Sequence, residues 1–232
     1  MQRSFDFGVD VDVLQMRDQL VGHFGEYSQA PKRTPIAQLV KSLISSRTHD
    51  EVSLLAFIQL TNRYASWSAL ADAPVEDVQR IISEVTFPDI KAQRVHLSLG
   101  AIRDSNPKFD LQFLSRKSTP DAIDWLEQLP GVGRKVSAAV LNFSTLRFPA
   151  LVIDTHVLRV LRRYGIVRPK ADTLMAYETM MEATSGWSAS ELTELHDLLK
   201  RLGKTHCRHH VVQCQSCSLR YDCVTAACKS NS

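Results

Sequence analysis

The chain has 232 residues, of which 44% are hydrophobic and 23% charged, and its formal net charge is +3. This composition is that of an ordinary soluble globular protein with one large or two small domains. No apolar run approaches the roughly 18 residues of a membrane span, and the N-terminus lacks the apolar core of a signal peptide. We therefore expect a cytoplasmic protein with no membrane partner. The mild positive charge permits a nucleic-acid partner without demanding one.

Helix signals recur along the chain. Apolar residues are spaced by three and four in successive stretches, which indicates the buried faces of helices. Proline fits the first helical position because the N–H that it lacks has no intrahelical partner there. Three apolar stretches follow such a start: Thr34-Pro35, Ala73-Pro74 and Thr119-Pro120. Ser188 and Glu191 have the spacing of a capping box. No alternating run predicts a strand, so we expect an all-α protein of about ten helices.

The segment LPGVGRK, residues 129–135, lies between two of these helical patterns. Gly131 and Gly133 allow a tight turn, and the next helix begins at once, so its first N–H groups point out of the turn. Such an edge suits a DNA phosphate, bound without regard to the base, and Arg134 adds charge. Gly131, Val132, Gly133 and Arg134 are therefore candidate DNA-binding residues. A plain helix–helix connection is the alternative.

Lys135 is predicted to lie in the first turn of the second helix. A lysine is unfavourable at the positive end of a helix, and this field and partial burial both favour the neutral amine that can attack carbon. The alternative is a long side chain that extends into water. Asp154 is predicted to cap the helix that follows it. It is either a plain cap or, near Lys135 in a polar cleft, a group that accepts a proton or offsets a developing cation.

Four cysteines near the C-terminus have the spacing C-x6-C-x2-C-x5-C: Cys207, Cys214, Cys217 and Cys223. In a reducing compartment disulfides are not expected, so this cluster predicts a metal or iron–sulfur site. Four thiolates hold either a [4Fe–4S] cluster or a zinc ion, and the spacing alone does not decide between them. Cys228 lies outside the pattern.

Together these motifs resemble the endonuclease III family of helix–hairpin–helix DNA glycosylases. The resemblance rests on LPGVGRK, on Asp154 19 residues after Lys135, on the four-cysteine pattern and on LVKSLISSRTHD at 39–50. It implies an all-α fold with two helical lobes flanking a DNA-binding cleft. Residues 28–147 would form a six-helix barrel with the hairpin. Residues 1–27 plus 148–232 would form a second lobe, with a [4Fe–4S] cluster on the four cysteines.

The resemblance also implies an activity. The protein would be a base-excision-repair DNA glycosylase with AP lyase activity, acting as a monomer on double-stranded DNA with damaged bases or abasic sites. Oxidised pyrimidines would be the leading substrate. Lys135 would attack the sugar and form a Schiff base, and Asp154 would assist. Arg208, His209 and His210, between the first two cysteines, would approach the DNA backbone; the alternative is that both histidines are merely solvated.

Three departures from the family pattern affect the substrate. Arg47 stands where family members usually carry a glutamine that fills the gap left by the flipped base. Pro88 would stiffen the loop before Lys91-Ala92, and the loop at 145–150 is one residue longer than usual. One alternative is therefore a mismatch or other-base glycosylase whose pocket is rebuilt around Arg47 and Pro88. A second alternative, from another class, is a non-catalytic DNA-damage or redox-sensing binding protein that keeps the hairpin and the cluster.

Overall fold

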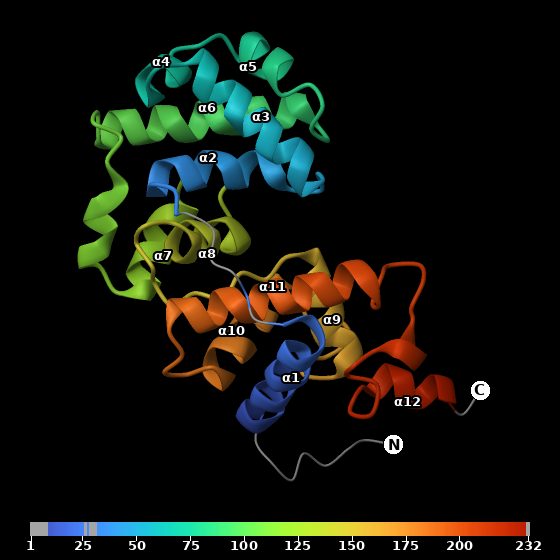
Figure 1. Cartoon of the computed structure of the whole chain (residues 1–232). Coiled ribbons are helices and arrows are strands. Elements are labelled where there is room, and N and C mark those ends of the chain that lie inside the picture. The colour runs from blue at the N-terminus through green and yellow to red at the C-terminus, as the bar shows by residue number, and fades with distance from the viewer. Residues whose placement is uncertain (1–8, 26, 28–31, 231–232) are drawn as a thin grey trace. The chain divides into compact units, whose positions relative to one another are not determined.

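The structure, a computed structural model, describes residues 9–25, 27 and 32–230. These residues form twelve α-helices and two 3-10 helices, and the only β-type pairings among them are two isolated bridges. The all-α prediction is therefore confirmed (Figure 1). The number of helices exceeds the expected ten because helices such as α4 (Trp67–Ala71), with five residues, are too short to show a period.

The chain divides into two compact units. One unit is the continuous segment Pro31–Phe148. The other combines Met1–Ala30 with Pro149–Ser232. We call them the hairpin unit and the cysteine unit, after the motifs that each contains.

Helix α2 (Pro35–Ser45) is the core of the hairpin unit. Eight of its side chains are buried, and it packs against α3 (Asp50–Arg63), α6 (Pro88–Ser105) and α8 (Arg134–Phe143) (Figure 1). Helices α4 and α5 (Val75–Ile81) pack on α6, and α7 (Thr119–Glu127) packs on α8. The 3-10 helix η1 (Leu111–Arg116) lies between α6 and α7 in the chain. This packing brings α6 and α8, which are distant in sequence, around one central helix.

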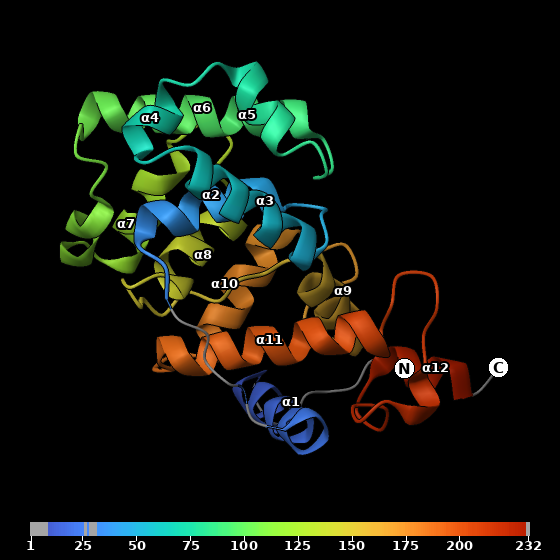
Figure 2. The ribbon, with the colours of Figure 1, turned by 45° about the horizontal axis from the view of Figure 1, so that its top comes forward.

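Helix α11 (Ala189–Thr205) organises the cysteine unit. It packs against α9 (Thr155–Tyr164) and α1 (Val9–Phe24), while α10 (Thr173–Ala183) also packs on both of these helices (Figure 2). Helix α12 (Val224–Ser230) packs on α9, and the short η2 (Cys214–Ser216) precedes it. The unit therefore joins the first helix of the chain to the last four.

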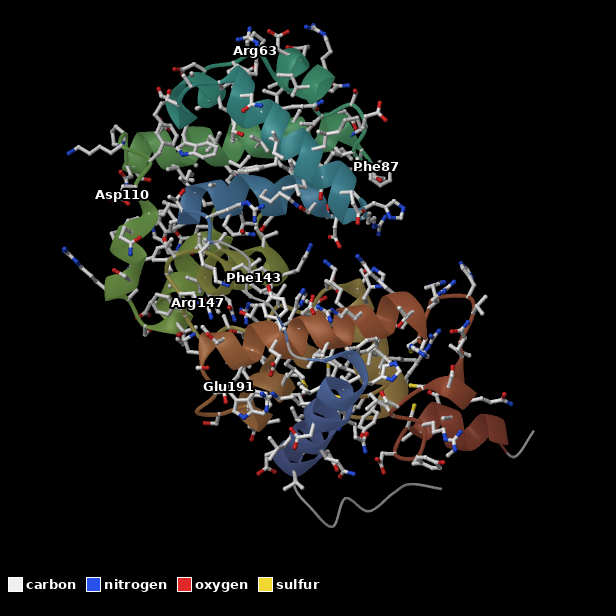
Figure 3. All side chains as sticks on the ribbon, in the orientation of Figure 1. Arg63, Phe87, Asp110, Phe143, Arg147 and Glu191 are labelled. Carbon is white, nitrogen blue, oxygen red and sulfur yellow. The ribbon has the colours of Figure 1, made fainter. Side chains whose placement is uncertain are left out.

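The helix starts test the capping predictions directly. The capping box of Ser188 and Glu191 at the start of α11 is confirmed, and Figure 3 labels Glu191. Pro35 begins α2 as predicted. The other two proline starts are shifted by one residue. Pro74 is itself the N-cap residue of α5, and α7 begins at Thr119 because Ser118 accepts a hydrogen bond from the Asp121 N–H.

Among the residues that the structure describes, none of the helices is both long enough and apolar enough to span a membrane.

Candidate functional site: the hairpin, Asp154 and the cysteine pocket

The connection between α7 and α8 is a tight turn held against α6. Gly131 has φ +80°, and a Cβ atom built there would lie 2.7 Å from the Arg94 side chain. The Ser98 hydroxyl donates a hydrogen bond of 2.6 Å to the Pro130 carbonyl. Gly131 is therefore required both for its left-handed backbone and for the close approach of α6.

Gly133 contributes in a different way from the one that the sequence suggested. Its φ is −120° and a Cβ atom there would meet nothing within 4 Å, so the turn does not need glycine at this position. It is the N-cap residue of α8, where no side chain covers the helix start. Val132 is buried, which leaves only its backbone as a DNA-binding candidate. The hairpin thus presents backbone rather than side chains at its tip.

We expect Gly131→Ala to lower the free energy of unfolding by about 1–3 kcal/mol, because alanine is strained at positive φ and collides with Arg94. The matched control is Gly100→Ala in the interior of α6, where the new Cβ meets nothing within 4 Å. It should raise stability by roughly 0.5–1 kcal/mol. Denaturant titration of both variants measures the difference, and equal effects would contradict this account of the turn.

Two basic residues begin α8. The Arg134 Nε atom lies 2.7 Å from Glu127 Oε1, and the Ser137 hydroxyl donates to the same oxygen at 2.9 Å. Arg134 therefore forms an ion pair inside the hairpin, although the sequence predicted it only as a phosphate ligand. Lys135 is half-buried in the first turn of α8, as predicted. Burial lowers the pKa of a second lysine, Lys91 of α6, and the charge of Lys135 lowers it further.

Arg47 lies in a surface loop of the same unit that is paired with a second loop. Arg47 and Phe87 are both exposed, and both have left-handed backbone, with φ of 54° and 57°. The Thr86 hydroxyl donates to the Arg47 carbonyl at 2.8 Å, which ties the loops together. Figure 3 labels Phe87 at the surface of the unit. The sequence reasoning missed Phe87. Pro88 excluded a helical conformation there but did not predict the left-handed one.

The loop at 145–150 is also ordered by local hydrogen bonds. Arg147 has φ 54°, and its Nη1 atom donates to the Asn142 carbonyl at 3.0 Å. The Phe148 N–H donates to the Leu141 carbonyl at 3.0 Å. These bonds fold the loop back on the end of α8, and Figure 3 labels Arg147 there.

Asp154 caps α9, as predicted. Its Oδ1 atom accepts hydrogen bonds from the N–H groups of His156 (2.8 Å) and Val157 (2.9 Å). Burial alone would raise the pKa of this carboxyl. The charges of His196, Lys200 and His156, together with the Val157 N–H, outweigh burial and leave the pKa below its usual value. Asp154 is therefore ionised at neutral pH.

Two further residues of the cysteine unit support this region, and the sequence reasoning missed both. His196 of α11 is buried, and its Nδ1 atom lies 2.7 Å from the Val152 carbonyl just before Asp154. Arg159 of α9 donates to the carbonyls of Cys207 (2.8 Å) and Gly203 (2.7 Å). One helix, α9, thus carries the Asp154 cap at its start and holds the first cysteine one turn later.

All four cysteines of the predicted cluster line one apolar pocket. Burial raises the pKa of Cys217 and Cys223, and the neighbouring cysteines act in the same direction. Arg163 of α9 lies over the pocket, with its Nη1 atom 3.5 Å from the Cys207 sulfur. No three His, Cys, Asp or Glu residues in the described ranges converge as ligands of a single metal ion. The four thiols thus share one apolar pocket without converging on a single point.

The predicted phosphate-binding residues Arg208, His209 and His210 follow Cys207 in an exposed loop. The carbonyls of Arg208 and His209 accept hydrogen bonds from Arg163, of 2.6 and 3.0 Å. The backbone of the loop is therefore fixed while its basic side chains remain exposed. Arg208, His209 and His210 lie in the cysteine unit with Asp154, whereas Lys135 and Arg47 lie in the hairpin unit.

Comparison with known proteins assigns the chain to a family. Residues 40–185 match the model of the HhH-GPD superfamily base excision DNA repair proteins. This chain belongs to the HhH-GPD superfamily. The match includes Arg47, the hairpin, Lys135 and Asp154. The four cysteines lie beyond the matched range, so superfamily membership by itself says nothing about them.

Several HhH-GPD relatives resemble this chain over most of their length. Endonuclease III of Rickettsia felis is 25% identical over 90% of this chain and 94% of its own length. Endonuclease III of Thermotoga maritima is 29% identical over 82% of each chain. Among solved structures, a trapped endonuclease III–DNA covalent intermediate has a TM-score of 0.79 at 23% identity, covering 97% of this chain and all of the other. The last comparison confirms the fold.

Proposed function

We propose that this chain is a DNA glycosylase with AP lyase activity that removes damaged bases, with oxidised pyrimidines as its leading substrate. The observation that carries the proposal is Lys135, half-buried in the first turn of the hairpin helix and within the range matched by the superfamily. The curated relatives named endonuclease III support it. So does the presence of an ionised Asp154 in the same matched range.

In this proposal the protein backbone at the hairpin makes the first contact with DNA. The uncapped start of α8 at Gly133 offers a phosphate the positive end of a helix. The exposed loop of Arg208, His209 and His210 supplies a second phosphate contact, and the exposed Arg47 and Phe87 enter the DNA beside the lesion. Extruding the damaged nucleotide costs a few kcal/mol of stacking and pairing, and side chains inserted into the gap offset that cost.

The chemistry then proceeds through Lys135. The neutral Nζ atom attacks C1′ of the extruded nucleotide, the bond between C1′ and the base breaks, and the base leaves with the electron pair. Asp154, an anion, stabilises the cationic character that develops on the sugar and receives the proton that Lys135 sheds. The Nζ lone pair then expels O4′ from C1′, and O4′ takes up the proton that Asp154 received, which opens the sugar ring. The product is a protonated Schiff base between Nζ and C1′ of the opened sugar.

The Schiff base accounts for the lyase step. The iminium group makes a C2′ proton acidic, and once this proton is removed the electrons expel the 3′ phosphate from C3′. Water then hydrolyses the iminium and frees Lys135. The strand is nicked by β-elimination, with no oxidant or reductant consumed.

The four cysteines fit a [4Fe–4S] cluster. Four thiols line one apolar pocket, and a cluster held by four thiolates needs such a donor set and such a shell. Cys207, Cys214, Cys217 and Cys223 would hold it. When bound, the cluster supplies a covalent crosslink that keeps the segment 207–223 folded. The cluster would hold the exposed basic loop in position, and Lys135 would carry out the reaction.

We expect the isolated protein to absorb broadly near 400 nm, as iron–sulfur proteins do. Cys223→Ser should lose this absorbance and weaken DNA binding at fixed salt, because the basic loop would no longer be held. Cys228→Ser, the same substitution outside the pattern, is the control and should retain both. A colourless protein with one equivalent of zinc would overturn the cluster assignment.

We assign residues 28–147 to the DNA-binding hairpin lobe and residues 1–27 plus 148–232 to the cluster lobe. We further propose that the protein is a monomer that works on chromosomal DNA in the cytoplasm.

The test of the function is a panel of duplexes that contain an oxidised pyrimidine, uracil, 8-oxoguanine, a mismatch or an abasic site. Base release and nicking with the oxidised pyrimidine support the proposal. Release from another duplex only would favour the rebuilt pocket around Arg47, and binding without release would favour a damage sensor.

A further inference from the structure

A buried lysine lies on α6, one turn from its start. Lys91 is only 2% exposed, which is rare for a lysine without an acidic partner. Within the described residues its ammonium has one hydrogen-bond partner, the Thr48 hydroxyl at 2.7 Å, and no carboxylate pairs with it. The proposed reaction does not use this residue, so its burial needs another explanation.

The charges that act on Lys91 are positive. Burial lowers the pKa of Lys91 to about 8, and the neighbouring charges of Lys135 and Arg94 lower it in the same direction. Lys135 lies at the start of α8, and Arg94 lies one turn further along α6 beside the hairpin glycine. Lys91 is therefore acted on by two further cations, Arg94 of its own helix and Lys135, the proposed nucleophile, of α8.

The acidic side chains on α6 and on the helices packed against α6 and α8 are either paired with other residues or exposed. Asp77 pairs with Arg80, Asp72 with Arg103, Glu127 with Arg134 and Asp121 with the Ser118 hydroxyl, and Glu76, Asp89, Asp104 and Asp124 are exposed. The positive field at the start of α8 thus comes from side chains as well as from the helix end.

We propose that Lys91 is a positioning residue whose buried positive charge holds a larger share of Lys135 in the neutral, nucleophilic form. The inference rests on the proposed role of Lys135. The repulsion between two ammonium groups is mutual, so the charge of each lysine disfavours the charge of the other. An ordinary lysine with a pKa of about 10.4 is almost entirely protonated at pH 7, and each unit of lowering makes the amine about tenfold more available. A neighbouring cation is one of the ways in which lysine nucleophiles are activated.

Lys91 also has a structural contact that must be separated from its charge. The Thr48 hydroxyl that accepts from Lys91 also accepts the Thr86 N–H at 3.0 Å, so Lys91 helps to hold the loops of Arg47 and Phe87. Substitution of Lys91 removes the charge and this anchor together. Substitution of Thr48 removes the anchor and retains the charge.

The experiment compares four variants with the wild type: Lys91→Met and Lys91→Gln, which remove the charge, Lys91→Arg, which keeps it, and Thr48→Val. Competitive labelling with a trace acylating reagent from pH 6 to 10, followed by peptide mass spectrometry, gives the titration midpoint of the Lys135 amine. We expect the midpoint to rise by about one unit in Lys91→Met and Lys91→Gln. It should stay near the wild-type value in Lys91→Arg and Thr48→Val. An unchanged midpoint in both charge-removing variants would overturn the proposal.

A second measurement follows the rate at which Lys135 forms the trapped adduct with DNA. The rate of borohydride trapping on an abasic duplex should fall about tenfold at pH 7 in Lys91→Met and recover as the pH rises toward 9. An equal loss at every pH would mean a purely structural role and would also overturn the proposal. If the wild type forms no adduct with DNA, the proposed function is refuted. The labelling experiment needs no activity, so it still tests whether Lys91 lowers the titration midpoint of Lys135.

Discussion

Lys135→Ala is expected to abolish the covalent adduct that borohydride traps between the wild type and duplex DNA with an abasic site. The adduct requires a primary amine at C1′, and alanine has none. Nicking of the same duplex should fall by at least roughly a thousandfold. Gel electrophoresis of the trapped complex and of the cut strand measures both losses.

The substitution should not unfold the protein. Lys135 lies in the first turn of α8, where a positive charge is unfavourable and alanine is a good helix former. DNA binding should persist, because the backbone of the hairpin tip is unchanged. Lys117→Ala, an exposed lysine of the same unit, is the control and should trap normally. Equal trapping by Lys135→Ala and the wild type would sink the lyase assignment.

The second large effect is expected from Asp154→Asn. Asparagine caps a helix about as well as aspartate, so the hydrogen bonds to the N–H groups of His156 and Val157 should survive, and stability should change by less than about 1 kcal/mol. The charge is lost, however. We expect the rate of base release to fall on the order of a hundred- to a thousandfold, because the proposed role of Asp154, stabilising the developing cation, needs its negative charge.

Asp154→Ala completes this comparison. It should lose the activity and also about 1 kcal/mol of stability, because the first-turn N–H groups of α9 lose their acceptor. Base release under single-turnover conditions and denaturant unfolding separate the two effects. If Asp154→Asn releases the base at the wild-type rate, Asp154 is a helix cap and nothing more.

The sequence predicted the features that depend on neighbouring residues. The Ser188 capping box, the Asp154 cap, the Pro35 start and the hairpin before Lys135 all involve groups within a few positions of one another. Local backbone geometry determines such contacts, so their spacing can be read from the chain. The same locality explains the small errors: Ser118 and Thr119 are both good caps, and only the built helix shows which one accepts the hydrogen bond.

The four-cysteine pattern is an intermediate case. Its spacing predicted a common site, and the structure places all four side chains around one pocket. The surroundings of that pocket were not predictable, because Arg163 reaches Cys207 across 44 positions of sequence. A residue this distant carries no local signal that it will lie over a sulfur atom.

By itself, the sequence determined the all-helical fold class, and it nominated Lys135, Asp154 and the four cysteines as the candidate site residues. Only the tertiary structure decided the environment of those groups. Lys91 meets Thr48 across 43 positions, and His196 meets the Val152 carbonyl across 44. The buried state of Lys91 is a property of α6 packed among its neighbours, and the low pKa of its amine follows from that burial and from Lys135. Desolvation and charge proximity depend on three-dimensional packing, which the order of residues specifies only through the whole fold.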